Sequence, residues 1–291
     1  MEILSRILLH SLDGFVFGWL YALIAFGLSL IFGILLIINV AHGALYMLGA
    51  VFGWFFVQGI TGDTGNFWLG LILAPLAVGV VAVLTEMIIL RPIENQPIMT
   101  ILSTFGLMLI FENLILGWVG GQAISVNAGI TGRFPLLIYQ YPYYRIFVMV
   151  LSISVAIGLW AFLKKTKYGL WVRAVRQNKD LALADGIPVR MVNTFAFGLG
   201  GVLAGLSGAL AAPIVSVSYQ MGLNILIVAF IVVIVGGLGD LLGAVVAGLI
   251  FGEVESLSAL IVEPTWARVI ALLFVTTFLF FRPNGLLSRT R

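Results

Sequence analysis

Long apolar runs separated by short polar connections dominate this chain. A helix needs about 20 consecutive apolar residues to cross about 30 Å of hydrocarbon, and most of the runs approach that length. The runs cover residues 14–38, 41–60, 67–90, 98–119, 144–163, 192–215, 224–236, 241–262 and 266–282. The pattern therefore predicts an all-α integral membrane protein, a polytopic bundle of about eight to nine transmembrane segments.

The runs are apolar on every helical face, as residues 147–163 illustrate. A transmembrane barrel would instead show segments of about ten residues with alternating polarity. Inside lipid every backbone polar group must find a partner within the protein, so helices are the remaining solution. Because no polar stretch is long enough for a soluble domain, residues 1–291 are predicted to form a single transmembrane domain.

The run from 224 to 236 is an exception. Its 13 residues would form a helix about 20 Å long at a rise of about 1.5 Å per residue, which is too short to span alone. Asn224 bounds it at one end, and the glycine-rich stretch 236–240 bounds it at the other. We therefore expect a broken or re-entrant hairpin near residues 224–262, since such backbone needs surrounding protein or a water-filled cavity.

Positive charge marks the connection 164–191. It carries Lys164, Lys165, Lys167, Arg173, Arg176, Lys179 and Arg190, out of 15 Lys and Arg residues in the chain. Because Lys and Arg concentrate in cytoplasmic loops, this segment is predicted to be cytoplasmic. Counting crossings then puts the turn at 91–94 and the basic tail from residue 282 inside. It puts the N-terminus and the short loop 120–142, expected to be an irregular folded cap, outside.

Composition narrows the chemistry further. Hydrophobic residues make up 62% of the chain and charged residues 9%, whereas soluble domains are about 25% charged. The absence of cysteine excludes disulfides and thiolate metal sites. The net charge is +3, and the basic residues are concentrated beside the membrane segments. They do not form the extended basic face of a nucleic-acid-binding protein. The glycines of 198–208 and the small residues of 244–256 recur at helical spacing, which predicts close helix contacts.

No motif for ATP binding or catalysis is present. A phosphate-binding loop needs the pattern GxxxxGK[ST], and the chain contains no Gly-Lys pair. His42 carries no metal-site signal, because the other histidine, His10, is distant in sequence and no carboxylate lies at ligand spacing. The chain is therefore predicted not to be an enzyme, and to hold no metal and no cofactor.

The basic segment has a helical pattern. Residues 170–185 contain good helix formers, and Gly186 with Pro188 provides a stop signal. Two interpretations follow for this short cytoplasmic helix. It lies on anionic lipid as a basic interfacial helix, or it docks against another protein, which the small face of Ala182, Ala184 and Gly186 favours.

A few polar residues interrupt the apolar runs. Asn39 and His42 lie three apart beside a glycine at a helix break, where they either satisfy freed backbone groups or face a solute. Ionisable residues inside a membrane are functional candidates by default, and Glu112, Asp240 and Glu253 qualify. If these carboxylates coupled transport to protons or sodium, the chain would be a secondary transporter or channel acting alone.

Several of these segments together resemble a known family. They are residues 21–27 (YALIAFG), 38–43 (INVAHG), 46–50 (YMLGA), the basic loop 168–188, and 236–239 (GGLG) followed by Gly243-Ala244. In this order they resemble the LivH-type permeases of branched-chain amino-acid ABC importers, over nearly the whole chain. The resemblance implies a permease of a bacterial inner membrane that carries branched-chain or other neutral amino acids, although similar permeases carry urea, short amides and aromatic carboxylates.

The resemblance also implies partners and roles. The partners would be a homologous second permease, two cytoplasmic ATPases that use ATP, and an extracytoplasmic solute-binding protein. The residues that would couple the chain to an ATPase are Arg173, Ala174, Arg176, Asp180, Ala182, Ala184 and Gly186. The residues that would line or shape the translocation pathway are Asn39, His42, Gly43, Gly236, Gly237, Gly239 and Asp240.

Overall fold

A computed structural model of the chain describes residues 2–59, 66–136, 138–281 and 285. The α-helices are α1 (Glu2–Leu35), α2 (His42–Trp54), α3 (Phe67–Thr85), α4 (Pro97–Val119), α5 (Tyr143–Lys165), α6 (Lys167–Gln177), α7 (Lys179–Ala184), α8 (Val189–Ala211), α9 (Met221–Gly236), α10 (Leu241–Ser258) and α11 (Pro264–Phe281). Short π-helices, η1 (Phe55–Gly59) and η3 (Glu86–Leu90), extend α2 and α3, and a 3-10 turn, η4 (Arg91–Ile93), follows η3. The basic tail with Arg282, Arg289 and Arg291 lies outside the described residues.

The predicted all-α membrane bundle is confirmed. Within the described residues, seven helices are long and apolar enough to cross a membrane. They are α1, α3 with its extension, α4, α5, α8, α10 and α11. The predicted runs 41–60 and 224–236 correspond to the shorter helices α2 and α9, so the total of eight to nine crossings stays a prediction.

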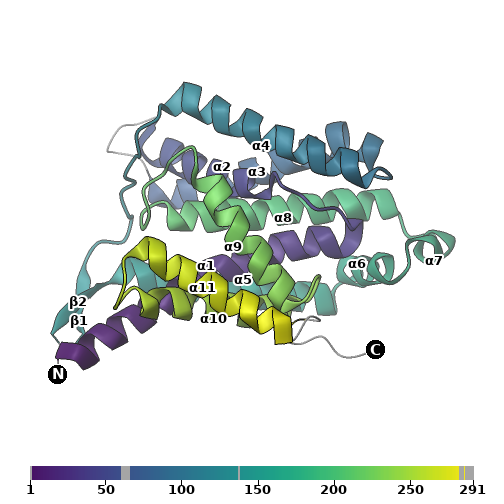
Figure 1. The fold of residues 1–291 in the computed structure, drawn as a ribbon. Helices are drawn as coiled ribbons and strands as arrows, with labels where there is room; N and C mark the ends of the chain where they lie inside the picture. The colour runs from purple at the N-terminus through teal and green to yellow at the C-terminus, as the bar shows by residue number, and fades with distance from the viewer. Residues whose placement is uncertain (1, 60–65, 137, 282–284, 286–291) are drawn as a thin grey trace.

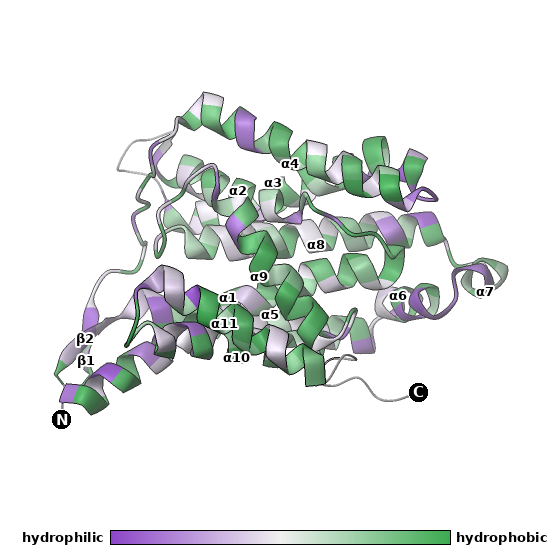
Figure 2. Ribbon diagram, viewed as in Figure 1, coloured by the Kyte–Doolittle hydropathy of each residue, from purple (hydrophilic) through white to green (hydrophobic). Residues whose placement is uncertain are grey.

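The helices run side by side, and the bundle has two distinct ends (Figure 1). One end carries α6 and α7 and is called here the basic end. The opposite end carries the N-terminus and a two-stranded sheet of β1 (Arg133–Leu136) and β2 (Tyr139–Pro142), and is called the strand end. Figure 2 shows long hydrophobic stretches along the helices and hydrophilic residues around α6 and α7, as expected if the bilayer surrounds the middle of the bundle.

The connections between helices lie at the ends that the count of crossings predicts for them. At the strand end, Arg6 donates to the Tyr139 hydroxyl at 3.3 Å, so the N-terminal turns of α1 lie beside the 120–142 loop. At the basic end, Lys179 pairs with Glu94 at 3.1 Å, so the turn at 91–94 lies beside the 164–191 segment. Which end faces the cytoplasm stays a prediction.

Two local predictions need correction. The 120–142 loop is not wholly irregular, because β1 and β2 pair from Arg133↔Pro142 to Leu136↔Tyr139, and Ile124 pairs with Val217. The basic segment forms two helices instead of one across 170–185, because Asn178 is extended and caps α7 by accepting from the backbone of Asp180 and Leu181. A capping side chain of this kind competes with continuation of the preceding helix.

Helices α1 and α8 form the centre of the bundle. Their apolar windows are 78% and 72% buried, compared with 17% for α11. Helix α1 packs mainly against α10, and α8 packs against α1, α2 and α3. Contacts between backbones are close where glycines meet: a Cβ added to Gly248 would lie 2.9 Å from the Gly18 carbonyl oxygen. The predicted small-residue contacts are therefore confirmed.

Helices α9 and α10 are joined by a short turn at the basic end. Helix α9 has 16 residues and is therefore about 24 Å long. Val217, shortly before α9, pairs with Ile124 at the strand end, whereas Gly239 accepts a hydrogen bond from Arg176 at the basic end. Whether α9 crosses the bilayer or re-enters it stays a prediction.

Candidate functional site

The break between α1 and α2 holds two fully buried polar side chains, Asn39 and His42. His42 Nε2 lies 3.0 Å from the Ile24 carbonyl oxygen, and because a carbonyl oxygen only accepts, Nε2 is the protonated nitrogen. Thr104 of α4 accepts from the Val40 N–H at 3.2 Å, which satisfies one backbone group that the break frees. Sequence reasoning missed Thr104, although it is a polar residue within an apolar run.

Three polar atoms at this break have no hydrogen-bond partner among the described residues. They are Asn39 Oδ1, Asn39 Nδ2 and His42 Nδ1. An unsatisfied buried polar group costs about 1–3 kcal/mol. Hydrogen bonds to the freed backbone groups therefore do not explain why these three polar atoms are buried here. The break is therefore a place where water, a solute or a second conformation would gain hydrogen bonds.

The predicted pathway residues do not form one surface. Asn39 and His42 are enclosed, and Gly43 packs against α9, where its Cβ would meet the Leu226 side chain at 2.8 Å. Gly236 packs on the backbone of Gly243 in α10. Their role in translocation stays a prediction.

The remaining pathway residues build the turn between α9 and α10. Gly237 and Gly239 have φ of +100° and +82°, a conformation that glycine adopts without steric penalty. Asp240 caps α10 by accepting from the N–H groups of Leu242 at 2.9 Å and Gly243 at 3.2 Å. This capping gives Asp240 a structural role whether or not it meets a solute.

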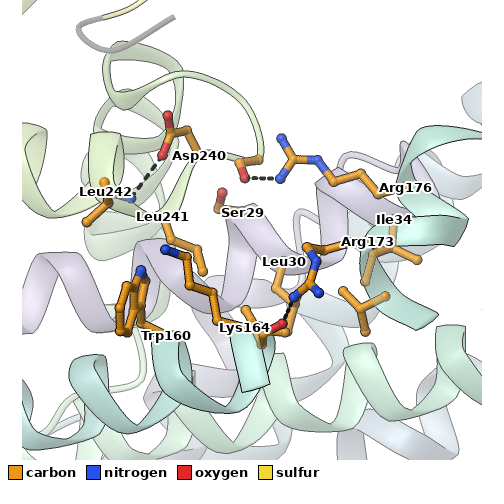
Figure 3. Close-up of a pocket in the computed structure, with 14 residues that line it drawn as sticks. Ser29, Leu30, Ile34, Trp160, Lys164, Arg173, Arg176, Asp240, Leu241 and Leu242 are labelled. Carbon is orange, nitrogen blue, oxygen red and sulfur yellow. Dashed lines mark hydrogen bonds between the residues drawn. The ribbon is translucent and has the colours of Figure 1, made fainter. Parts of the chain in front are cut away.

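Helix α6 is attached to this turn across a cavity of about 360 Å³ (Figure 3). Arg176 Nη1 donates to the Gly239 carbonyl at 2.5 Å, and Arg173 donates to the Leu163 carbonyl at the end of α5. Both arginines thus reach back into their own chain. The Arg176 hydrogen bond therefore joins the α6 helix to the α9–α10 turn.

Helix α7 is the outermost element of the basic end (Figure 1). Leu181 and Leu183 are 64% and 53% exposed, whereas Ala182 between them is 2% exposed. The predicted docking face is therefore wrong for Ala182, which packs inward because α7 lies with that side against its own chain. Ala184 and Gly186 are exposed as expected. Sequence reasoning missed Leu183; its signal is an apolar residue in a hydrophilic segment.

The carboxylates considered for ion coupling do not converge. Glu112 is on α4, Glu253 is on α10, and Asp240 begins α10. Ser11 donates to Glu253 at 3.4 Å, whereas Glu112 Oε1 has no partner among the described residues. Nowhere in the part of the chain that the structure describes do three or more His, Asp or Glu side chains gather as a metal site would require.

Comparison with known proteins is consistent across the chain. Residues 11–279 match the family described as "Branched-chain amino acid transport system / permease component". The high-affinity branched-chain amino acid transport system permease protein LivH of Escherichia coli K12 is 25% identical over 304 residues, covering 95% of this chain and 94% of LivH. BraD of Pseudomonas aeruginosa, with the same description, is 25% identical over 293 residues with equal coverage. The ribose import permease protein RbsC of Bacillus subtilis is 26% identical over 165 residues, covering 53% of this chain and 50% of RbsC.

Proposed function

The chain belongs to the family of permease components of branched-chain amino acid transport systems, and on this premise we propose that its solute is a branched-chain or other neutral amino acid. It is a multi-pass permease subunit of an importer in a bacterial inner membrane. Its relatives are transport components and not enzymes. The solute assignment rests on the descriptions of LivH and BraD, which align with nearly the whole chain.

One observation carries the mechanism: two leucines are exposed on α7 at the outermost point of the basic end. Exposed apolar side chains that gather in one place mark a protein or a membrane contact. We propose that the basic end is cytoplasmic and that α7 docks on an ATPase. Because the sequence has no phosphate-binding loop, ATP hydrolysis belongs to two partner ATPases and this chain binds no cofactor.

The other proposed partners follow from the same arrangement. A homologous second permease would cover the exposed face of α11, whose Leu273 and Phe274 are 62% and 50% exposed. A solute-binding protein would deliver the solute at the strand end. Movement of α7 and α6 would reach the α9–α10 turn through Arg176 and Gly239, and ATP would drive transport by favouring one of two access states over the other.

Replacing Arg176 with alanine should uncouple the importer. The ATPases would still dock through α7, but α6 would lose its hydrogen bond to the Gly239 carbonyl. We expect solute uptake to fall about tenfold, equivalent to about 1.4 kcal/mol and within the usual range of coupling free energies, while ATP hydrolysis continues. The measurement is the ratio of leucine imported to ATP hydrolysed. Arg190→Ala, which neutralises another exposed arginine of this segment, is the control and should keep the ratio.

The proposed function is tested by reconstitution. The chain, its second permease and the two ATPases are placed in vesicles with the loaded solute-binding protein, and uptake of radiolabelled L-leucine is followed. Uptake should require ATP and all subunits. Uptake by this chain alone on a proton or sodium gradient would instead identify a secondary transporter and overturn the proposal.

A further inference from the structure

Two cavities follow one another along α1 from the strand end inward. The outer one, about 270 Å³, is lined by His10 and Asp13, and Asp13 accepts from the Tyr141 hydroxyl of β2. The inner one, about 210 Å³, is lined by Leu20 farther along α1 and by Tyr46 of α2. Both are lined by Phe17, Tyr21, Val215 and Arg268. These shared residues form the boundary between the two cavities.

The boundary contains an ion pair between two membrane-spanning helices. Arg268 Nε of α11 donates to Glu255 Oε1 of α10 at 2.8 Å, and the Tyr21 hydroxyl donates to Glu255 Oε2 at 2.7 Å. The Arg268 and Glu255 side chains are 45% and 16% exposed, so both are within reach of a solute. Charged residues within membrane segments are costly, face cavities, and commonly mark substrate pathways.

The guanidinium has capacity for a further partner. Arginine carries five N–H donors in a planar fork that matches a carboxylate, and the Glu255 carboxylate accepts from the Nε donor of Arg268. Glu255 supplies a negative charge on the outer side of the same boundary. A free anion would be repelled by Glu255 and a free cation by Arg268, whereas a molecule carrying both charges on adjacent groups complements the pair.

The inner cavity complements a small apolar side chain. Leu20, Ile225 and Val228 line it, and its polar lining includes Asn224, Tyr46, Ser216 and Ser218. Drug-sized ligands occupy pockets of about 300–1,000 Å³, so a cavity of about 210 Å³ suits a smaller solute. Its walls would favour an aliphatic group over a polyhydroxylated sugar, which would leave hydroxyls unpaired.

We propose that this boundary is a binding site for a zwitterionic amino acid. The α-carboxylate binds the Arg268 guanidinium, the α-ammonium binds the Glu255 carboxylate, and the aliphatic side chain enters the inner cavity against Leu20 and Val228. The solute class rests on the proposed function, whereas the site rests on the two cavities and on the charges between them. Arg268, Glu255 and Tyr21 are therefore specificity-determining residues of the pathway.

Thiol labelling tests the site directly, because the natural chain has no cysteine. Ser218→Cys introduces one thiol at the inner cavity, which Ser218 lines. In the assembled importer without its solute-binding protein, millimolar L-leucine should slow labelling of this thiol. The oxo acid of leucine, which lacks the ammonium, and isopentylamine, which lacks the carboxylate, should not. Gln140→Cys, exposed on β2, should label at the same rate in every case.

A doubly neutralised variant separates a binding site from a structural ion pair. Glu255→Gln combined with Arg268→Gln leaves no unpaired buried charge, so the fold should tolerate it. Retained ATP hydrolysis and normal Gln140→Cys labelling would confirm assembly. The leucine concentration that protects Ser218→Cys should rise about 30-fold or more, as expected when a ligand loses buried charged partners. Unchanged protection in this variant would overturn the site and reduce the pair to a structural role.

The two proposals fail in distinguishable ways. If the wild-type importer moves leucine but the doubly neutralised variant binds leucine equally well, the site is wrong and the proposed function stands. If the wild-type importer hydrolyses ATP, imports no leucine and shows no protection by leucine, both the solute assignment and this site are wrong.

Discussion

Replacing Leu181 and Leu183 together with glutamate should separate the permease from its ATPase and abolish ATP-driven uptake. Both side chains are more than half exposed on α7, so glutamate at these positions meets water and leaves the permease fold intact. In the docked complex the same carboxylates would be buried against an apolar groove. Central anchors of an interface contribute at least about 2 kcal/mol each when removed, and buried unpaired charge adds to the penalty. Two such losses would reduce affinity at least about 1,000-fold.

The measurement is co-purification of the ATPase with the tagged permease, followed by uptake in vesicles. The matched control is Ile138→Glu, which places the same charge on a residue that is 58% exposed, between β1 and β2 at the opposite end. The control should retain the ATPase. Normal ATPase recovery with the leucine variant would show that α7 lies on lipid instead, as the interfacial interpretation of this segment holds.

Replacing Gly208 with valine should destabilise the packing of α8 against α2. A Cβ at Gly208 would collide with the Tyr46 carbonyl oxygen and lie 3.0 Å from the backbone nitrogen of Ala50. These are backbone atoms of α2, so no side-chain rotation relieves the clash, and α2 must move away from α8. Overpacking of a tight core costs about 1–3 kcal/mol and occasionally more; we expect at least about 3 kcal/mol here because the obstacle is backbone.

The measurement is thermal unfolding of the purified chain in detergent, with yield from the membrane as a second readout. Gly158→Val in α5 is the matched control, because a Cβ there would meet nothing within 4 Å. This control should unfold at nearly the wild-type temperature. Equal melting of the two variants would mean that α2 and α8 are less closely packed than described.

The pattern of the sequence was sufficient for the membrane class, the order of helices and the end of the basic segment. Hydrocarbon thickness and backbone hydrogen bonding constrain such segments strongly, so apolar runs translate almost directly into α3, α4, α5 and α8. Gly186 ends the basic segment as expected, with φ of +77°, because only glycine adopts this conformation readily. Both the membrane-spanning helices and the end of the basic segment thus follow from residues that are close together in the sequence.

Contacts between distant segments decided the rest. Helix α1 begins at Glu2 and not near residue 14, and Arg6 and Asp13 in this added part form hydrogen bonds with tyrosines of β2. Similarly, the inward side of Ala182 follows from how α7 lies on the bundle and not from the composition of its helix. The side chains of small residues are compatible with either a buried or an exposed position, so the sequence does not show which face of the helix is exposed.

The candidate site divides in the same way. Along the chain, Asn39, His42 and the 236–240 turn are recognisable as polar or glycine-rich interruptions of apolar runs, and the basic segment is recognisable by its charge. Only the fold brings Arg176 to the Gly239 carbonyl and places Tyr21, Glu255 and Arg268 around one boundary. Residues 21 and 255 are 234 positions apart, and no periodic pattern encodes a pairing across that separation. Local physics determined which segments enter the membrane, whereas helix packing determined which of their polar groups meet.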